Sequence, residues 1–138
     1  MADTAARTET TPSLRREAIL EAVAYTAERL LLTPDWREAA DSVLTRLGEA
    51  TDVSRCYIME NSNGGDGRLL TTVVFEWSAP GVQPQIAVNP FLDESPWDDG
   101  YQRWASAHAR GEPVASRVKD LPPSERPELE RQGILSIL

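Results

Sequence analysis

Cysteine and histidine each occur only once in this chain of 138 residues, as Cys56 and His108. A lone cysteine cannot form an internal disulfide, and one cysteine with one histidine cannot build a cysteine/histidine metal cage. We therefore expect no metal site of that kind. A chain without disulfides suits a reducing compartment, so the sequence predicts a cytoplasmic location.

Basic residues are also scarce, because 14 Lys and Arg stand against 22 Asp and Glu and give a formal net charge of -8. Binding to a polyanion needs a Lys/Arg-rich face, so nucleic acid is not an expected partner. No uninterrupted apolar run approaches the ~18 residues of a membrane span, and no cationic start precedes an apolar core. We expect no membrane insertion, a disordered segment over residues 1–12 and one domain over residues 13–138.

The motifs of common catalytic sites are missing as well. The sequence has no Gly-rich phosphate loop, nucleophile elbow or suitably spaced histidine–carboxylate pair. Asp93, Glu94, Asp98 and Asp99 could bind a cation or serve as acid and base, but they flank Pro96 and are better explained as a solvated helix start. We therefore expect that the chain is not itself an enzyme.

Two helices are predicted at the start of an α+β fold. From Pro12 to Leu32, apolar residues recur at i, i+3, i+4 and i+7, which is typical of an amphipathic helix. We expect one stripe to face the core: Leu20, Val23, Ala24, Ala27, Leu30 and Leu31. A second apolar stripe consists of Leu14, Ala18, Ile19, Ala22 and Tyr25. It would suit packing against the same helix of another copy in a homodimer, although burial under the domain's own loops explains it equally well.

The second helix is predicted to begin at Thr33 as its N-cap, with Pro34 in the first helical position, and to end near Asp52. Alternating residues then predict strands over residues 53–60 and 69–78, joined by the Gly/Asn/Asp-rich loop 61–67. Later elements are a third helix over residues 97–109, a short edge strand over 113–115, a brief helix from Pro123 and a strand over 134–138. We expect an antiparallel sheet flanked by helices.

Large aromatic rings gather around the Pro-rich segment of residues 80–96. Phe75 and Trp77 precede this segment, and Trp97, Tyr101 and Trp104 follow it. Rings grouped in this way could line a small-molecule pocket, but they could equally be an ordinary core. A Pro-rich loop of this length inside a compact domain is often functional.

The two single residues have ordinary explanations beside their chemical ones. His108 shares a helix face with Tyr101 and Trp104 and could line the pocket or bind a haem iron. Packing, or a favourable interaction with the helix dipole, explains it better. Cys56 lies on a predicted strand, where a cysteine is more often a small buried hydrophobe than a reactive thiol. An enzyme that depends on Cys56 or His108 is therefore a third hypothesis.

The order of these elements resembles a GAF domain of the kind found in bacterial sensor kinases. The segments that carry the resemblance are FEWSAPGVQPQI, GYQRWASAHARGEPV and LPPSERPELERQGILSIL. The family implies further strands and a terminal helix after the apolar ILSIL segment, so we expect that part of a GAF/PAS-like domain is missing at the C-terminus. It also implies a sensory module that binds a small molecule or dimerises to control an output domain.

The subtypes of that family fit this sequence poorly. The segment NPFLDE at Asn89–Glu94 has letters of the cyclic-nucleotide pattern but lacks its lysine and its spacing. A covalently attached tetrapyrrole is not expected either, because the family attaches it to a cysteine next to a histidine and Cys56 lies far from His108 in the sequence. The cofactor is therefore unknown. We expect closure of the segment 80–100 over a ligand to shift the first helix and thereby the output domain. The alternative is a ligand-free interaction or dimerisation domain.

Overall fold

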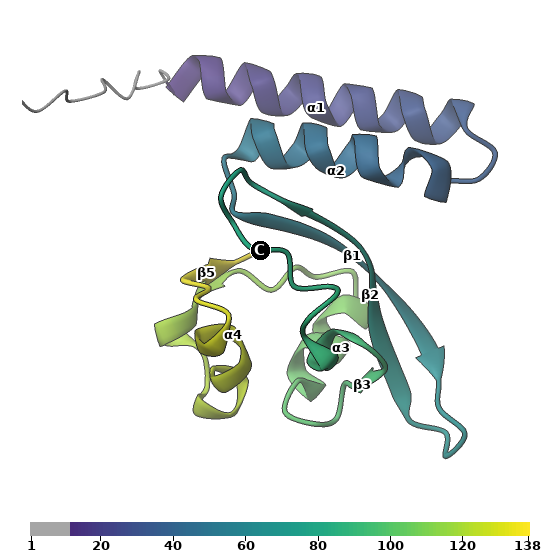
Figure 1. Cartoon of the computed structure of the whole chain (residues 1–138), viewed down its shortest axis with the longest axis vertical. Coiled ribbons are helices and arrows are strands. Elements are labelled where there is room, and N and C mark those ends of the chain that lie inside the picture. Colours follow the sequence, from purple (N-terminus) through teal and green to yellow (C-terminus); the bar gives the residue numbers. More distant parts are fainter. Residues whose placement is uncertain (1–11) are drawn as a thin grey trace, which may run out of the picture. The chain divides into compact units, whose positions relative to one another are not determined.

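A computed structural model of the chain describes residues 12–138 (Figure 1). Residues 1–11 of the predicted disordered segment lie outside the described residues. The elements confirm the predicted α+β class with a small antiparallel sheet. In chain order they are α1 Pro12–Leu32, α2 Arg37–Thr51, β1 Arg55–Asn63, β2 Leu69–Ser78, β3 Ser95–Pro96, α3 Gln102–Ala109, β4 Ser116–Arg117, α4 Pro127–Arg131 and β5 Ser136–Ile137, with short 3-10 turns at Pro90–Leu92, Val118–Asp120 and Pro123–Glu125.

The strands form one sheet in the order β1-β2-β3 and a separate pair, β4-β5. β3 runs antiparallel to β2, with Leu70 opposite Pro96 and Thr71 opposite Ser95. The chain divides into two compact units. Unit 1 comprises residues up to Ile58 together with Phe75–Gln85, and unit 2 comprises Met59–Val74 and Ile86–Leu138. The hairpin of β1 and β2 thus contributes residues to both.

Unit 1 is built on the packing of α1 against α2, which lie side by side in Figure 1. Its buried apolar side chains include three alanines: Ala22, Ala39, Ala40, Val43 and Leu44 are each at most 6% exposed. Alanines at these positions allow two helices to approach closely. Arg15 of α1 also donates a hydrogen bond from Nη2 to the carbonyl oxygen of Thr51 at the end of α2, at 2.8 Å.

The two faces of α1 are reversed relative to the expectation from its sequence. Leu20, Val23 and Leu31, expected in the core, are 62%, 53% and 85% exposed. Ala22, expected in a dimer interface, is fully buried within the chain. The remaining members of the expected dimer stripe are divided: Ala18, Ile19 and Tyr25 are half-buried, and Leu14 is exposed.

The start of α2 also differs from the expectation. The helix begins at Arg37, and Thr33 and Pro34 lie in the preceding turn, where the Thr33 amide donates to the carbonyl of Arg29. Asp35, and not Thr33, hydrogen-bonds to the first turn of α2, because its Oδ1 accepts a hydrogen bond from the Arg37 amide at 3.0 Å. An aspartate side chain at such a position satisfies one of the free amides of the first turn.

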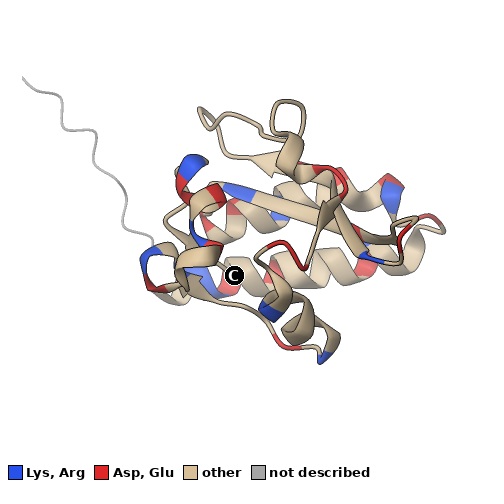
Figure 2. Ribbon diagram, turned by 90° about the horizontal axis from the view of Figure 1, so that it is seen from below, with Lys and Arg blue, Asp and Glu red and all other residues tan. Residues whose placement is uncertain are grey.

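Unit 2 holds its own core. Val118, Leu121 and Leu129 are buried, with Trp104, Ile134 and Ile137 packed against them. The expected third helix is shorter than predicted, because residues 97–101 form turns before α3, and the strand pairing expected at 113–115 occurs at β4. Basic and acidic residues are interspersed along the described chain (Figure 2).

Candidate functional site

The residues predicted to line a pocket are divided between the two units. Phe75 and Trp77 belong to unit 1, and Trp97, Tyr101, Trp104 and His108 belong to unit 2. In unit 1, Phe75 lies edge-on to Trp36 of the turn before α2, with ring centroids 5.8 Å apart. Phe75 and Trp77 are two residues apart on β2, as side chains on one face of a strand are. Both lie against the α2 region, Phe75 at Trp36 and Trp77 at Gly48.

The aromatic residues of unit 2 pack in two pairs. Trp97 and His108 meet edge-on at 5.7 Å between centroids, and Tyr101 and Trp104 do so at 5.1 Å. Phe91 extends the second pair through a tilted contact with Tyr101 at 5.7 Å. The structure therefore brings the four predicted residues of this unit into contact as pairs, through the edge-to-face geometry that aromatic rings prefer.

The polar atoms of these rings already have partners inside unit 2. Trp97 Nε1 donates to Asn61 Oδ1 at 2.9 Å, and Trp104 Nε1 donates to the Glu125 carboxylate at 2.7 Å. The Tyr101 hydroxyl donates to the backbone carbonyl of Glu125 at 3.1 Å. A ligand could thus meet these residues through their ring faces, but not by taking their hydrogen-bonding groups without breaking internal bonds.

Glu125 is the centre of a polar cluster that sequence reasoning missed. Its side chain is 3% exposed and accepts two hydrogen bonds from Arg103, at 2.9 Å from Nε and 2.6 Å from Nη2. The hydrogen bonds from Arg103 and Trp104 hold the pKa of Glu125 below its ordinary value, against the opposing effect of burial. The cluster joins α3 to the turn at Pro123–Glu125 and so fixes the orientation of α3 within unit 2.

A second buried polar pair, Asn89 and Glu128, anchors the Pro-rich segment. Asn89 Nδ2 donates to Glu128 Oε1 at 2.6 Å, and Asn89 Oδ1 accepts from the Phe91 amide at 3.1 Å. Gln132 and Arg131 also donate to the Glu128 carboxylate. The only signal in the sequence was the N-P pair, which predicts a turn and not a buried partner 39 residues away.

Two of the acidic residues considered for cation binding, Asp98 and Glu94, have other partners in the structure. Asp98 pairs with Arg68 at 2.6 Å, both side chains being about half exposed, and the Arg68 hydrogen bond holds the pKa of Asp98 below its ordinary value. Glu94 donates its amide to Thr72 Oγ1. Within residues 12–138, no group of three or more histidine, cysteine or carboxylate side chains could hold a metal ion.

The sheet residues of unit 1 carry another buried charge. The side chain of Glu76 is 1% exposed, lies 3.8 Å from Arg55 Nε and accepts the Gln85 amide at 2.8 and 2.9 Å. Burial, together with the charge of Glu76, raises the pKa of Tyr57 to about 12. Burial also raises the pKa of the Cys56 thiol, which agrees with a packing role for this residue.

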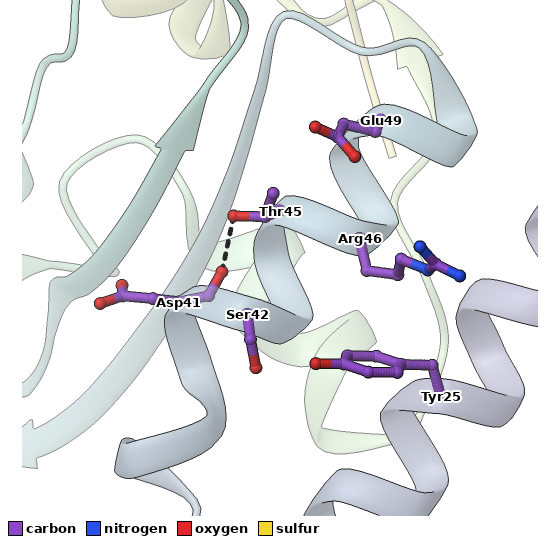
Figure 3. Close-up of a pocket in the computed structure, with 6 residues that line it drawn as sticks. All are labelled: Tyr25, Asp41, Ser42, Thr45, Arg46 and Glu49. Carbon is purple, nitrogen blue, oxygen red and sulfur yellow. Dashed lines mark hydrogen bonds between the residues drawn. The ribbon is translucent and has the colours of Figure 1, made fainter.

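Two hollows lie in unit 1. One, of about 370 Å³, runs between the two helices and is lined by Tyr25, Asp41, Ser42, Thr45, Arg46 and Glu49. In Figure 3 the ring of Tyr25 reaches across from α1 toward the side of α2 that carries Ser42 and Arg46. The guanidinium of Arg46 lies 5.6 Å from the centre of that ring, so its charge already has a cation–π partner.

The second hollow has a volume of about 300 Å³ and only apolar lining, from Leu30, Trp36, Ala40, Val43 and Ile58. These residues come from α1, the turn before α2, α2 itself and β1. The sequence placed Leu30 in the expected core stripe of the first helix and gave no signal for a hollow. We call this feature the apolar hollow.

No protein-family model matches the chain, and no solved structure matches it. The chain is 40% identical over 125 residues to the methanogenesis regulatory histidine kinase FilI of Methanothrix harundinacea (strain 6Ac). The matched part is 91% of this chain but only 14% of that kinase, so the chain spans about one seventh of its relative. This homology supports a regulatory module of signal transduction. None of the helices described between residues 12 and 138 combines the length and hydropathy that a membrane crossing requires.

Proposed function

We propose that this chain is a GAF-like sensory module that binds a small hydrophobic molecule in the apolar hollow and so controls an output domain of a signalling protein. The likeness to one part of a regulatory histidine kinase supports the signalling role. The observation that carries the ligand is the hollow itself, which is lined only by apolar side chains.

The size of the hollow suggests the kind of ligand. Pockets for small molecules typically measure about 300–1,000 Å³, and this hollow lies at the lower limit. Because its lining offers no polar group to orient a ligand, the hollow favours a small aromatic or aliphatic molecule. Trp36 provides a ring against which an aromatic ligand could stack, and its position is held by the edge contact with Phe75.

The lining also suggests how binding would be transmitted. A ligand in the hollow would contact Leu30 at the end of α1, Ala40 and Val43 of α2, and Ile58 of β1. Such a ligand controls an output only if it binds one arrangement of these elements more tightly than another. In this proposal the ligand acts directly on the helix pair, in place of the loop closure expected from the sequence.

Thermal unfolding of the whole chain tests the proposal, with toluene, indole and octanoate as probes of three hydrophobic shapes. A ligand present at a hundredfold excess over its Kd stabilises the folded state by about 2.7 kcal/mol. We expect at least one probe to raise the Tm, and Leu30→Trp to abolish that shift, because Leu30 lines the hollow but is 44% exposed, so a larger ring there fills the hollow without entering the close helix contact. Leu32→Trp is the control and should leave the shift intact, because Leu32 is 72% exposed and does not line the hollow. A shift that survives in Leu30→Trp would place the ligand elsewhere.

A ligand-free interaction domain is the second candidate. It is favoured by the internal hydrogen bonds of Trp97, Tyr101 and Trp104, which indicate that these rings serve packing. This candidate predicts that none of the three probes changes the Tm. For the enzyme hypothesis, any activity found must be lost in Cys56→Ala or His108→Ala, and activity retained in both variants would exclude these residues from the mechanism.

A further inference from the structure

Trp36 is the aromatic member of the apolar hollow. The other four lining residues are aliphatic: Leu30, Ala40, Val43 and Ile58. Trp36 belongs to the turn between α1 and α2 and is half-buried. An aliphatic wall recognises a ligand by its size and apolar area, whereas an aromatic ring also distinguishes an aromatic ligand from a saturated one. Any selectivity of the hollow for aromatic ligands must therefore come from this one side chain.

Contacts outside the hollow hold the indole ring of Trp36 in place. The guanidinium carbon of Arg37 lies 4.7 Å from the centre of the ring, and Phe75 meets the ring edge-on, with centroids 5.8 Å apart and planes at 66°. Neither of these two residues lines the hollow. The backbone of Trp36 is fixed as well, because its carbonyl accepts a hydrogen bond from the Ala39 amide at 3.0 Å. A ring that is already held in this way loses little side-chain freedom when a ligand binds against it.

The volume and the lining of the hollow favour a neutral ligand of one or two rings. An apolar protein cavity of about 150 Å³ is large enough for benzene, and this hollow measures about 300 Å³. A charged group placed among the five apolar side chains would lose its hydration without gaining a partner. The positive charge of Arg37 beside the indole ring further disfavours a cation at this position.

We propose that Trp36 makes the apolar hollow selective for neutral aromatic molecules over saturated molecules of the same carbon skeleton. This inference rests on the proposed function, because it concerns the ligand of the same site. An aromatic ligand gains a stacked or edge-to-face contact with Trp36 beyond the apolar area that it buries. A saturated ring lacks that contact, although it carries more hydrogens and buries at least as much apolar area. A hollow that acted through apolar area alone would therefore not prefer the aromatic ligand.

Toluene and methylcyclohexane are a matched pair of probes, since both consist of a six-membered ring with one methyl group and differ in aromaticity. NMR titration of the whole chain measures the Kd of each, and the indole N–H signals of the four tryptophans report where it binds. We expect toluene to bind roughly two- to tenfold more tightly than methylcyclohexane and to shift the Trp36 signal most. Trp36→Leu identifies that signal by its loss and should bind both probes without the preference. Trp36→Phe keeps an aromatic ring and should keep the preference.

The possible results separate this inference from the proposed function. Equal affinities, or tighter binding of methylcyclohexane, would overturn the selectivity and leave the hollow as a binding site. A preference for toluene that persists in Trp36→Leu would overturn it too, because the selectivity would then lie elsewhere. Binding of neither probe would count against both the inference and the ligand assigned to the hollow. If circular dichroism shows that Trp36→Leu is unfolded, Leu30→Trp decides, because filling the hollow should abolish the preference and its persistence would refute the role of Trp36.

Discussion

The indole ring of Trp77 occupies the space that a side chain on Gly48 would need. A Cβ atom added to Gly48 would lie 2.8 Å from Cδ2 of the ring and closer still to Cε3 and Cζ3. Gly48 lies inside α2, where glycine costs about 1 kcal/mol of helix stability relative to alanine. The glycine therefore permits the close approach of β2 to α2 at the expense of helix propensity.

This contact predicts that Gly48→Ala destabilises the protein. Overpacking a tight contact costs about 1–3 kcal/mol, which exceeds or cancels the gain in helix propensity. We expect a lower urea midpoint together with a change in tryptophan fluorescence as Trp77 moves. Gly65→Ala is the control, because an added Cβ there meets nothing within 4 Å. Equal stability of Gly48→Ala and the parent chain, without a spectral change, would contradict the packing described for Trp77.

The hydrogen bonds of Glu125 predict a large difference between two acidic residues. Glu125→Ala leaves Trp104 Nε1 without its acceptor and Arg103 without its partner, so we expect a loss of about 1–3 kcal/mol in the free energy of unfolding. Glu112→Ala removes an ion pair with Arg110 in which both side chains are more than half exposed. That change should cost less than about 1 kcal/mol. Comparable urea midpoints for the two variants would show that the Glu125 cluster contributes little.

The lowered pKa of Glu125 predicts a dependence of stability on pH. A carboxyl group with a folded-state pKa below its ordinary 4.5 contributes stability above that pH and loses it as the pH falls through the folded-state value. The stability difference between the parent chain and Glu125→Gln should therefore be constant near neutral pH and shrink below about pH 4.5. Urea unfolding of both proteins from about pH 7 to pH 3 measures it. A difference that grows on acidification would contradict the assigned direction.

The raised pKa of Tyr57 predicts an ordered titration of the tyrosines. The absorbance change of Tyr57 should occur near pH 12, above the range of an exposed tyrosine, and should disappear in Tyr57→Phe. Because a raised pKa favours the protonated folded state, this residue stabilises the fold below about pH 10 and ceases to do so as the pH rises toward 12. An absorbance change of Tyr57 centred near pH 10, as for an exposed tyrosine, would contradict the assigned direction.

Helices and strands whose sequences carry a clear local pattern were predicted well. The bounds of α1 and β2 agree with the predicted ranges 12–32 and 69–78, because helical periodicity and strict alternation are properties of the local sequence. The face that α1 buries was not predictable from periodicity, since the helix is apolar on several sides. The choice is made by α2, whose alanines at positions 39 and 40 pack with the side of α1 that carries Ala22 and leave Leu20 and Leu31 outside.

The polar anchors of unit 2 illustrate a different limit. Glu125 and Glu128 lie in a segment that reads as a solvated turn and helix start, yet both are buried. Their partners Arg103 and Asn89 are 22 and 39 residues away. Nothing in the spacing of charges along a sequence indicates pairs at such separations.

The hairpin that serves both units has a practical consequence. The chain passes from unit 1 to unit 2 after Ile58, returns at Phe75 and leaves again after Gln85, so β1 and β2 each have one end in either unit. Neither unit can be excised as a continuous fragment without cutting through paired strands. A truncated variant of this protein must therefore keep both strands of the hairpin. For the same reason we expect units 1 and 2 to unfold in a single thermal transition.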